Sequence, residues 1–104
     1  MKKAYFTITG INHYYGYKLF KEDMVVDLVK EPKNEYDKEA IQVKLEGLGI
    51  VGYVANSPHT KLGESMSAGR LYDRFGKRGK GRVKYVMPQG ILCELVEETQ
   101  NIQY

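Results

Sequence analysis

The sequence predicts a mainly β fold, either a small, mostly antiparallel barrel or a strongly bent sheet. About six short segments rich in β-branched and aromatic residues are separated by turn residues, and one interrupted segment has a helical pattern. Strands do not alternate with long helices, which argues against a parallel sheet. With 104 residues, 42% of them hydrophobic, the chain can bury one modest core. We therefore expect a single domain over 1–104, with its core at about 4–97 and a polar tail at 98–104.

The first two strands are expected in the N-terminal third. Residues 4–9 alternate between two faces, as in a half-buried strand. A loop with three tyrosines in four residues follows between Gly10 and Tyr17. Residues 24–29 form a nearly continuous apolar run, which is typical of a central strand.

A sharp turn should connect this strand to the next one. Pro32 has no backbone donor, so the strand should end just before it, and residues 33–34 should form the turn. Asp37 is placed to cap a single helical turn over 38–40. An alternating strand at 41–45 follows.

The middle of the chain combines a hairpin and a helix signal. Residues 47–49 make a tight connection to a hairpin partner at 50–54, in which Gly52 indicates a bulge or a close backbone approach. Ser57 followed by proline is typical of a helix start, and the pattern predicts a helix over about 58–66.

The last third should close the sheet. Residues 70–75 have the pattern of one or two further helical turns, and 76–81 predict a flexible basic loop. Two closing strands are expected at 82–87 and 91–97, joined by a turn at 88–90.

Composition argues against several classes of protein. No apolar run approaches the roughly 18 residues of a membrane span, and residues 4–9 are too short and too hydroxylated for a signal-peptide core. The single cysteine, Cys93, shares a strand face with apolar residues and provides neither a disulfide framework nor a zinc site. We expect a cytoplasmic protein with no metal, no cofactor and no membrane partner.

Positive charge is concentrated in one part of the chain. Between positions 70 and 84 the only acidic residue is Asp73, and seven of the 16 Lys and Arg residues lie there: Arg70, Arg74, Lys77, Arg78, Lys80, Arg82 and Lys84. Such a cluster suits a polyanion, because each neutralised phosphate releases condensed counterions. The alternative is a solvated surface that keeps the domain soluble.

The aromatic residues have an unusual bias. Nine are tyrosines, and five of these fall in loops or at strand ends: Tyr14, Tyr15, Tyr17, Tyr36 and Tyr53. Small barrels that bind single-stranded nucleic acid combine aromatic stacking platforms with a positive groove. The alternative for each tyrosine is simple packing against the domain.

The turn after the second strand gathers an amide, a phenol and a carboxylate, from Asn34, Tyr36 and Asp37. Loops on a rigid scaffold often carry binding groups, although Asn34 and Asp37 would also serve merely to satisfy the turn backbone.

Catalytic patterns are scarce. The histidines are His13 and His59, with no metal-ligand spacing, no triad order and no phosphate-binding loop.

A longer motif resembles a known family. The chain contains E-P-x-N-x-Y-D-x-x-A-I from Glu31 to Ile41, preceded by Gly10-x-x-x-Tyr14-Tyr15 and followed by Val51-Gly52-Tyr53-Val54. This succession resembles the HIRAN domain, which is found in some SWI/SNF-type DNA-repair helicases and as free-standing bacterial proteins. The segments 52–58 and 66–73 are similar to the small stand-alone bacterial branch.

The resemblance implies an OB-like β-barrel with a helical insert and, in the helicase members, capture of the 3′-hydroxyl end of single-stranded DNA. By position, Tyr14 and Tyr36 match aromatics that embrace terminal bases. Asn34 and Asp37 match polar groups near the terminal sugar, and Tyr15 matches a tyrosine that lines the pocket.

The chain departs from the helicase pattern at four positions. His13 stands where those members have an arginine, and Tyr53 where they have a histidine. Asn56 replaces a phosphate-binding lysine, and Gln89 replaces a phenylalanine that stacks. The cluster at 70–84 would then offer phosphate contacts from another side.

The leading hypothesis is a non-enzymatic module that binds single-stranded DNA at a 3′ end, or another nucleic acid, with a helicase or repair protein as a further partner. The alternative is a protein-interaction accessory module that uses the same aromatic loops. A third hypothesis is a small phosphodiesterase that uses His13 and Asp37.

Overall fold

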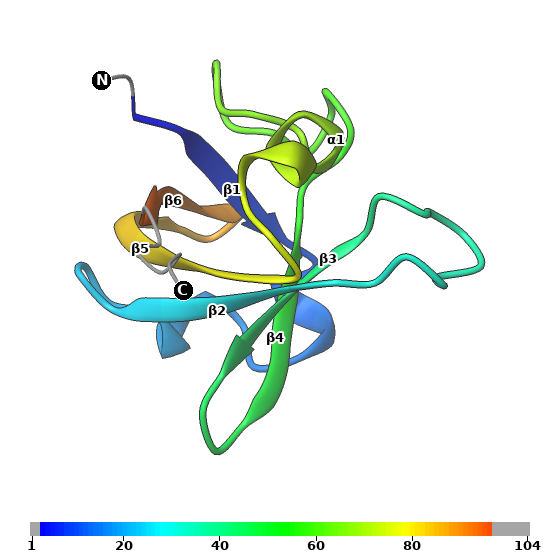
Figure 1. Ribbon diagram of the computed structural model, residues 1–104. Helices are drawn as coiled ribbons and strands as arrows, with labels where there is room; N and C mark the ends of the chain where they lie inside the picture. Colours follow the sequence, from blue (N-terminus) through cyan, green and yellow to red (C-terminus); the bar gives the residue numbers. More distant parts are fainter. Residues whose placement is uncertain (1–2, 97–104) are drawn as a thin grey trace.

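The computed structural model describes residues 3–96, which form a closed six-stranded antiparallel barrel (Figure 1). The order of neighbouring strands is β1-β4-β3-β2-β5-β6, and β6 closes the barrel by pairing with β1. The strands are β1 (Tyr5–Thr9), β2 (Val25–Lys30), β3 (Ile41–Leu45), β4 (Gly49–Val54), β5 (Arg78–Met87) and β6 (Gly90–Val96). The helical elements are short: η1 (Ile11–His13), η2 (Tyr17–Leu19), α1 (Ala68–Leu71) and η3 (Tyr72–Arg74). The predicted mainly β fold with six strands is confirmed and is consistent with an OB-like barrel.

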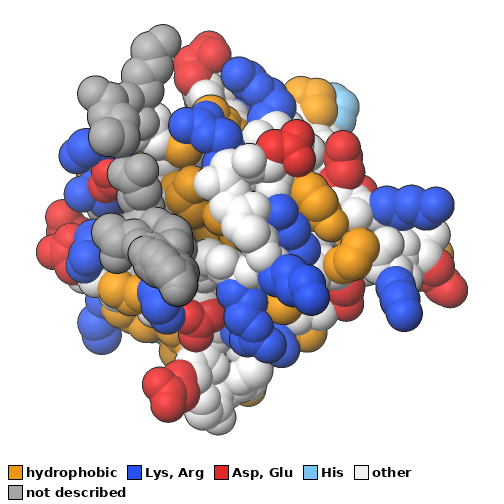
Figure 2. Space-filling view, viewed as in Figure 1, with side chains coloured by type: hydrophobic (Ala, Val, Ile, Leu, Met, Phe, Trp, Pro, Cys, Tyr) orange, Lys and Arg blue, Asp and Glu red, His pale blue; other side chains and the backbone are white. Residues whose placement is uncertain are grey.

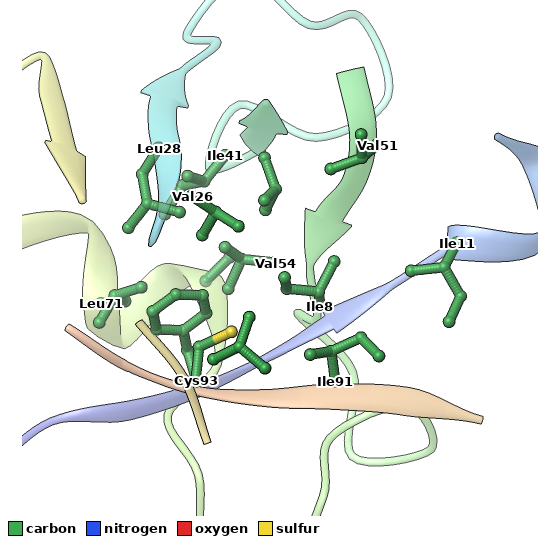
Figure 3. Packing of buried hydrophobic residues seen from close by; sticks show 14 of the residues in the cluster. Ile8, Ile11, Val26, Leu28, Ile41, Val51, Val54, Leu71, Ile91 and Cys93 are labelled. Carbon is green, nitrogen blue, oxygen red and sulfur yellow. The ribbon is translucent and has the colours of Figure 1, made fainter. Parts of the chain in front are cut away.

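The core lies inside the barrel and is built by the inward face of each strand (Figure 3). In Figure 3, Leu71 of α1 and Ile11 of η1 lie at opposite sides of the cluster, so these two short helices cover its two ends. Fully burying one such side chain contributes about 1.5–3 kcal/mol. Cys93 is fully buried in this core, as its strand pattern predicts.

Each strand of the barrel has one face that points into the core and one face that points outward. In β2, Val26 and Leu28 are fully buried, whereas Val25 is 43% exposed. The prediction of a central strand at 24–29 is therefore wrong in one respect: a closed barrel has no strand that is covered on both sides.

Gly52 behaves as the sequence predicts. The register between β3 and β4 shifts at Val43–Lys44, opposite Gly52. A Cβ atom at Gly52 would lie 2.6 Å from Cγ2 of Ile8 and 2.9 Å from the carbonyl oxygen of Thr9. The glycine therefore combines a bulge in the hairpin with a close approach to β1.

The predicted flexible loop at 76–81 is wrong, because β5 already begins at Arg78. Gly79 and Gly81 are buried strand residues that make room for aromatic rings. A Cβ atom would lie 2.8 Å from the Phe75 ring at Gly79 and 2.5 Å from the Phe6 ring at Gly81. These glycines allow close packing in a strand and do not mark a loop.

The predicted helix at 58–66 is also wrong, because the segment forms a series of turns laid over β1. The backbone N–H of Leu62 donates to Oγ1 of Thr7 at 2.9 Å, and the N–H of Met66 donates to the Tyr5 carbonyl at 2.7 Å. Ser65 Oγ and Thr7 Oγ1 are 2.8 Å apart and both residues are buried. Bonds to β1 thus replace the bonds that a helix would make within itself. The helical turns predicted at 70–75 are present as α1 and η3.

The described residues contain no helix that is long and apolar enough to cross a membrane. The last residue of the predicted strand 91–97 and the predicted polar tail lie outside the described residues.

Candidate nucleic-acid interface

The turn between β2 and β3, residues 31–40, projects from the barrel and carries much of the predicted site (Figure 1). Oδ1 of Asn34 accepts hydrogen bonds from the backbone N–H groups of Tyr36 at 2.8 Å and Asp37 at 2.9 Å. An amide that accepts two backbone bonds holds the turn in one conformation. The prediction that Asn34 satisfies the turn backbone is therefore confirmed, and the turn presents Tyr36 in a defined place.

Asp37 has two hydrogen bonds of its own. Oδ1 accepts from the backbone N–H of Glu39 at 2.9 Å, and Oδ2 accepts from Nδ2 of Asn56 at 3.0 Å. The predicted helical turn at 38–40 is instead a hydrogen-bonded turn, closed by the N–H of Ala40 donating to the Asp37 carbonyl at 3.0 Å.

Asn56 connects this turn to α1. Its Nδ2 also lies 3.3 Å from Oε1 of Glu39, and its Oδ1 accepts from the backbone N–H of Gly69 at 2.9 Å. A side chain at Gly69 would collide with Glu39, because a Cβ atom there would lie 2.6 Å from Oε1. The Asp37 carboxylate is thus held between its own turn and the start of α1.

Glu31 is the residue that sequence reasoning missed. Its Oε1 accepts from Nδ2 of Asn34 at 2.9 Å and from the Tyr53 hydroxyl at 3.1 Å, while Oε2 accepts from Nε2 of Gln42 at 2.6 Å. The hydrogen bond from Asn34 is the main cause that lowers the pKa of Glu31. The one signal in the sequence was the pairing of strands 41–45 and 50–54, which places Gln42 and Tyr53 opposite each other. Glu31 therefore ties the turn to the barrel wall.

Tyr53 occupies the wall beside the turn. Burial first, and then the hydrogen bond to Glu31, raise the pKa of Tyr53 from 10.0 to about 12. An electrostatic interaction with the Tyr14 hydroxyl raises the pKa of Tyr53 further. Tyr14 is 42% exposed and Tyr36 is 90% exposed, so both rings are available to a ligand.

Three other predicted positions lie outside this hydrogen-bonded group. The Tyr15 hydroxyl donates to the carbonyl of Leu48 at 3.3 Å, which places it at the β3–β4 turn, the opposite end of that hairpin from Asp37. His13 is exposed in η1, and within residues 3–96 no hydrogen bond joins it to Asp37. Gln89 is exposed in the β5–β6 turn.

The basic cluster is spread over α1, η3 and β5. Along β5, Arg78, Lys80 and Arg82 alternate with buried residues and therefore lie on the outside of the barrel. Figure 2 shows Lys and Arg side chains gathered over the region where β2 runs beside the start of β5, with acidic side chains among them.

Acidic neighbours pair with part of this cluster. Nζ of Lys80 lies 2.7 Å from Asp27, and Nζ of Lys84 lies 3.8 Å from Glu94. In the part of the chain that the structure describes, five cluster members have no carboxylate within 4.0 Å: Arg70, Arg74, Lys77, Arg78 and Arg82. The charges of these five side chains are therefore not neutralised by a described carboxylate.

Lys30 fixes the segment that carries these cations. Its Nζ donates to the Phe75 carbonyl at 2.7 Å and lies 4.4 Å from the centre of the Tyr72 ring and 4.8 Å from that of Phe75. Burial lowers the pKa of Lys30, while Asp73 raises it. The lysine thus anchors η3 to β2, and its charge is directed into the protein.

The described residues provide little for catalysis. Burial raises the pKa of the Cys93 thiol far above its ordinary value, so the sulfur is inert as a nucleophile. Residues 3–96 contain no group of three His, Cys, Asp or Glu side chains that could hold a metal ion.

Comparison with known proteins identifies the family. The sequence matches the HIRAN domain over residues 1–98. A crystal structure of a Lactobacillus plantarum protein is similar with a TM-score of 0.62 and 25% identity, covering 88% of each chain. The crystal structure of the HIRAN domain of human HLTF shares the fold with a TM-score of 0.60 and 20% identity, over 95% of this chain and 78% of that one. No curated protein matches significantly. The chain therefore belongs to the HIRAN domain family, whose members are generally nucleic-acid-binding modules and not catalytic domains.

Proposed function

We propose that this chain binds single-stranded DNA at a 3′-hydroxyl end and acts as a binding module without catalysis of its own. The observation that carries the proposal is the Asp37 carboxylate, which is held by Glu39 and Asn56 in the same turn as the exposed Tyr36. A helicase or repair protein that generates or presents such ends is the partner class that fits this activity.

The bonding of Asp37 supports recognition of a hydroxyl. A carboxylate offers about four lone-pair positions, and the bonds from Glu39 and Asn56 use one on each oxygen. The remaining positions can accept a hydrogen bond from a terminal 3′-hydroxyl. The Glu39 carboxylate lies beside the same Asn56 amide, so a terminal phosphate would meet two negative charges.

The aromatic rings supply affinity for the terminal bases. Tyr14, which directly follows η1, and Tyr36, in the turn between β2 and β3, are both exposed. Stacking a base on an exposed ring contributes about 1–3 kcal/mol.

The five cations that have no carboxylate within 4.0 Å among residues 3–96 supply the salt-dependent part of binding. Each phosphate contact with a single strand contributes about −0.7 to the slope of log K against log salt. If all five contact phosphates, the slope reaches roughly −3.5. A protein interface anchored by aromatic residues would show a much smaller slope.

The test compares short fluorescent strands that end in a 3′-hydroxyl or a 3′-phosphate, followed by anisotropy at about 50 and 200 mM salt. We expect the hydroxyl end to bind more tightly. Asp37→Ala should weaken that binding by about 1–3 kcal/mol, because the hydroxyl loses its partner. The variant should not weaken binding of the phosphate end, because it removes one of the two negative charges that repel the phosphate. Glu35→Ala, which removes an exposed carboxylate from the same turn, is the matched control and should preserve the preference.

Other outcomes would contradict the proposal. Equal binding of both ends that falls with salt would leave a general nucleic-acid surface formed by the basic cluster. Absence of binding at either salt concentration would favour a protein partner. Trimming of the strand by the wild-type protein, abolished in Asp37→Asn, would reveal a phosphodiesterase.

A further inference from the structure

A groove of about 470 Å³ has a lining that includes none of the residues of the proposed end-binding site. Its apolar lining comes from Tyr5, Leu62, Met66 and Leu92, on β1, β6 and the segment laid over β1. The ring of Tyr5 is 37% exposed, and the other three side chains are partly buried. An apolar hollow with one accessible ring is suited to a flat aromatic ligand.

The groove is already formed in the free protein. Its wall, residues 62–66, is attached to β1 at both ends, through the bond from Leu62 to Thr7 and the bond from Met66 to Tyr5. The buried contact between Ser65 and Thr7 adds a third attachment. A wall held in this way does not have to be ordered by the ligand, which favours binding.

Among the described residues that line the groove, cationic side chains outnumber acidic ones. Lys3 and Arg70 both line it and are exposed. Lys3 is 3.4 Å from Glu94, but within residues 3–96 no carboxylate lies within 4.0 Å of Arg70. Arg74 adds a further cation, because its Nη1 lies 3.7 Å from Sδ of Met66. Among the described residues that line the groove, the one acidic side chain is Glu64.

The groove is connected to Asp37 through α1. Asn56 bonds to Asp37 on one side and to the N–H of Gly69 on the other, and Arg70 is the next residue. Consecutive Cα atoms are about 3.8 Å apart. Arg70, which lines the groove, is therefore one residue away from the backbone group that is bonded to the amide holding Asp37.

We propose that this groove is a second subsite, which holds a base of the same single strand on Tyr5 while Arg70 contacts the adjoining phosphate. The proposal rests on the proposed function for the origin of the strand. It assigns binding roles to Tyr5, Met66 and Leu92. These residues belong neither to the basic cluster nor to the segments that carry Tyr14 and Tyr36.

The experiment measures affinity as a function of strand length. Strands of about two and about eight nucleotides with a 3′-hydroxyl are compared, since small barrels cover about 4–16 nucleotides. We expect the longer strand to bind more tightly, and Tyr5→Ala to reduce its affinity roughly 5- to 150-fold, the range for one stacked base. Tyr5→Ala should leave the affinity of the shorter strand and its preference for the hydroxyl end unchanged, while Tyr5→Phe should retain the gain with length.

Two further probes separate stacking from charge. A strand of the same length with abasic sites beyond its two terminal nucleotides keeps its phosphates but has no bases to stack in the groove. It should be insensitive to Tyr5→Ala and still sensitive to Arg70→Gln. Lys18→Gln removes an exposed charge elsewhere and should not reproduce the effect of Arg70→Gln.

A gain with length that survives both Tyr5→Ala and Arg70→Gln would overturn the proposal, as would no gain at all. Equal loss for natural and abasic strands in Tyr5→Ala would also overturn it, because stacking would then not be involved. The melting temperature of each variant shows whether a loss of affinity arises from unfolding. If Tyr5→Ala is unstable, the affinity of Arg70→Gln, which changes an exposed residue, still tests the groove. If the short strand shows no end preference but the long strand depends on Tyr5 and Arg70, the end-binding proposal fails while the groove stands.

Discussion

Replacing Glu31 by alanine tests whether the proposed site depends on a residue that contacts no ligand. The Glu31 carboxylate accepts hydrogen bonds from three side chains, those of Asn34, Gln42 and Tyr53. Glu31→Ala leaves all three donors without this partner. It also frees Asn34, the residue that holds the turn in place through its other side-chain atom.

The expected loss of stability follows from these three bonds. An unsatisfied donor costs about 1–3 kcal/mol, and partial access to water brings each value toward the lower end. The sum is roughly 3 kcal/mol. In a domain of this size 1 kcal/mol corresponds to about 4–8 °C in melting temperature, so we expect a decrease of roughly 10–25 °C.

The assay is thermal and urea unfolding of Glu31→Ala beside Glu35→Ala, which removes an exposed carboxylate from the same turn. The pKa of folded Glu31 is lowered, so its contribution to stability is present above the ordinary glutamate pKa and is lost as the pH falls through the lowered value. The acid side of the stability profile should therefore flatten in Glu31→Ala. Equal stability of the two variants would refute the idea that Glu31 ties the turn to the wall.

Two further predictions concern Tyr53 and the glycines of β5. The pKa of Tyr53 is raised to about 12, so its hydroxyl stabilises the fold fully below pH 10 and loses this effect as the pH rises through 12. The difference in unfolding free energy between wild type and Tyr53→Phe should therefore shrink by about 1–2 kcal/mol across that interval, and a constant difference would contradict the assignment. Gly81→Ala should destabilise the protein by about 1–3 kcal/mol, because its Cβ would overlap the Phe6 ring. Gly76→Ala, with no atom within 4 Å of the added carbon, should be nearly neutral in the same urea titration.

The strands could be predicted because a barrel wall imposes one simple pattern. Residues 41–45 alternate between buried and partly exposed positions, and Ile41 and Val43 are fully buried. Period-two alternation depends only on the local backbone, so it is legible in a single sequence. The same holds for Gly52, since a glycine inside a strand typically marks a bulge or a close backbone approach.

The wrong predictions at 58–66 and 76–81 have a common origin in tertiary contacts. Ser57 and Pro58 are a valid local helix signal, but the backbone of 58–66 finds its partners on β1 instead. The glycines of 76–81 predict flexibility only because the sequence does not reveal which rings pack against them. In both cases a contact between distant residues overrides a local preference.

The sequence could predict that Asn34 to Asp37 form one turn, but not how their side chains are bonded. The motif from Asn34 to Asp37 marks the turn, and the structure places those residues together. Glu31 was missed because its role requires knowing that Gln42 and Tyr53 are opposite each other in neighbouring strands. Tyr15 could not be placed from the sequence, because its position depends on a contact with a distant part of the chain. Its hydroxyl donates to the carbonyl of Leu48 in the β3–β4 turn.

Asn56 is a position at which this chain departs from the helicase pattern, and its contacts bear on the function proposed above. The resemblance implies a phosphate-binding lysine at this position, and an asparagine supplies no charge for that contact. The Asn56 amide donates to the Asp37 carboxylate and accepts a hydrogen bond from the N–H of Gly69. A lysine could not make both bonds, because it has no acceptor for the N–H of Gly69. The Asp37 carboxylate is thereby held in place, and the turn is joined to the start of α1. The asparagine therefore lacks the charge that a lysine would offer to a phosphate, but it orients the carboxylate that is proposed to read the hydroxyl.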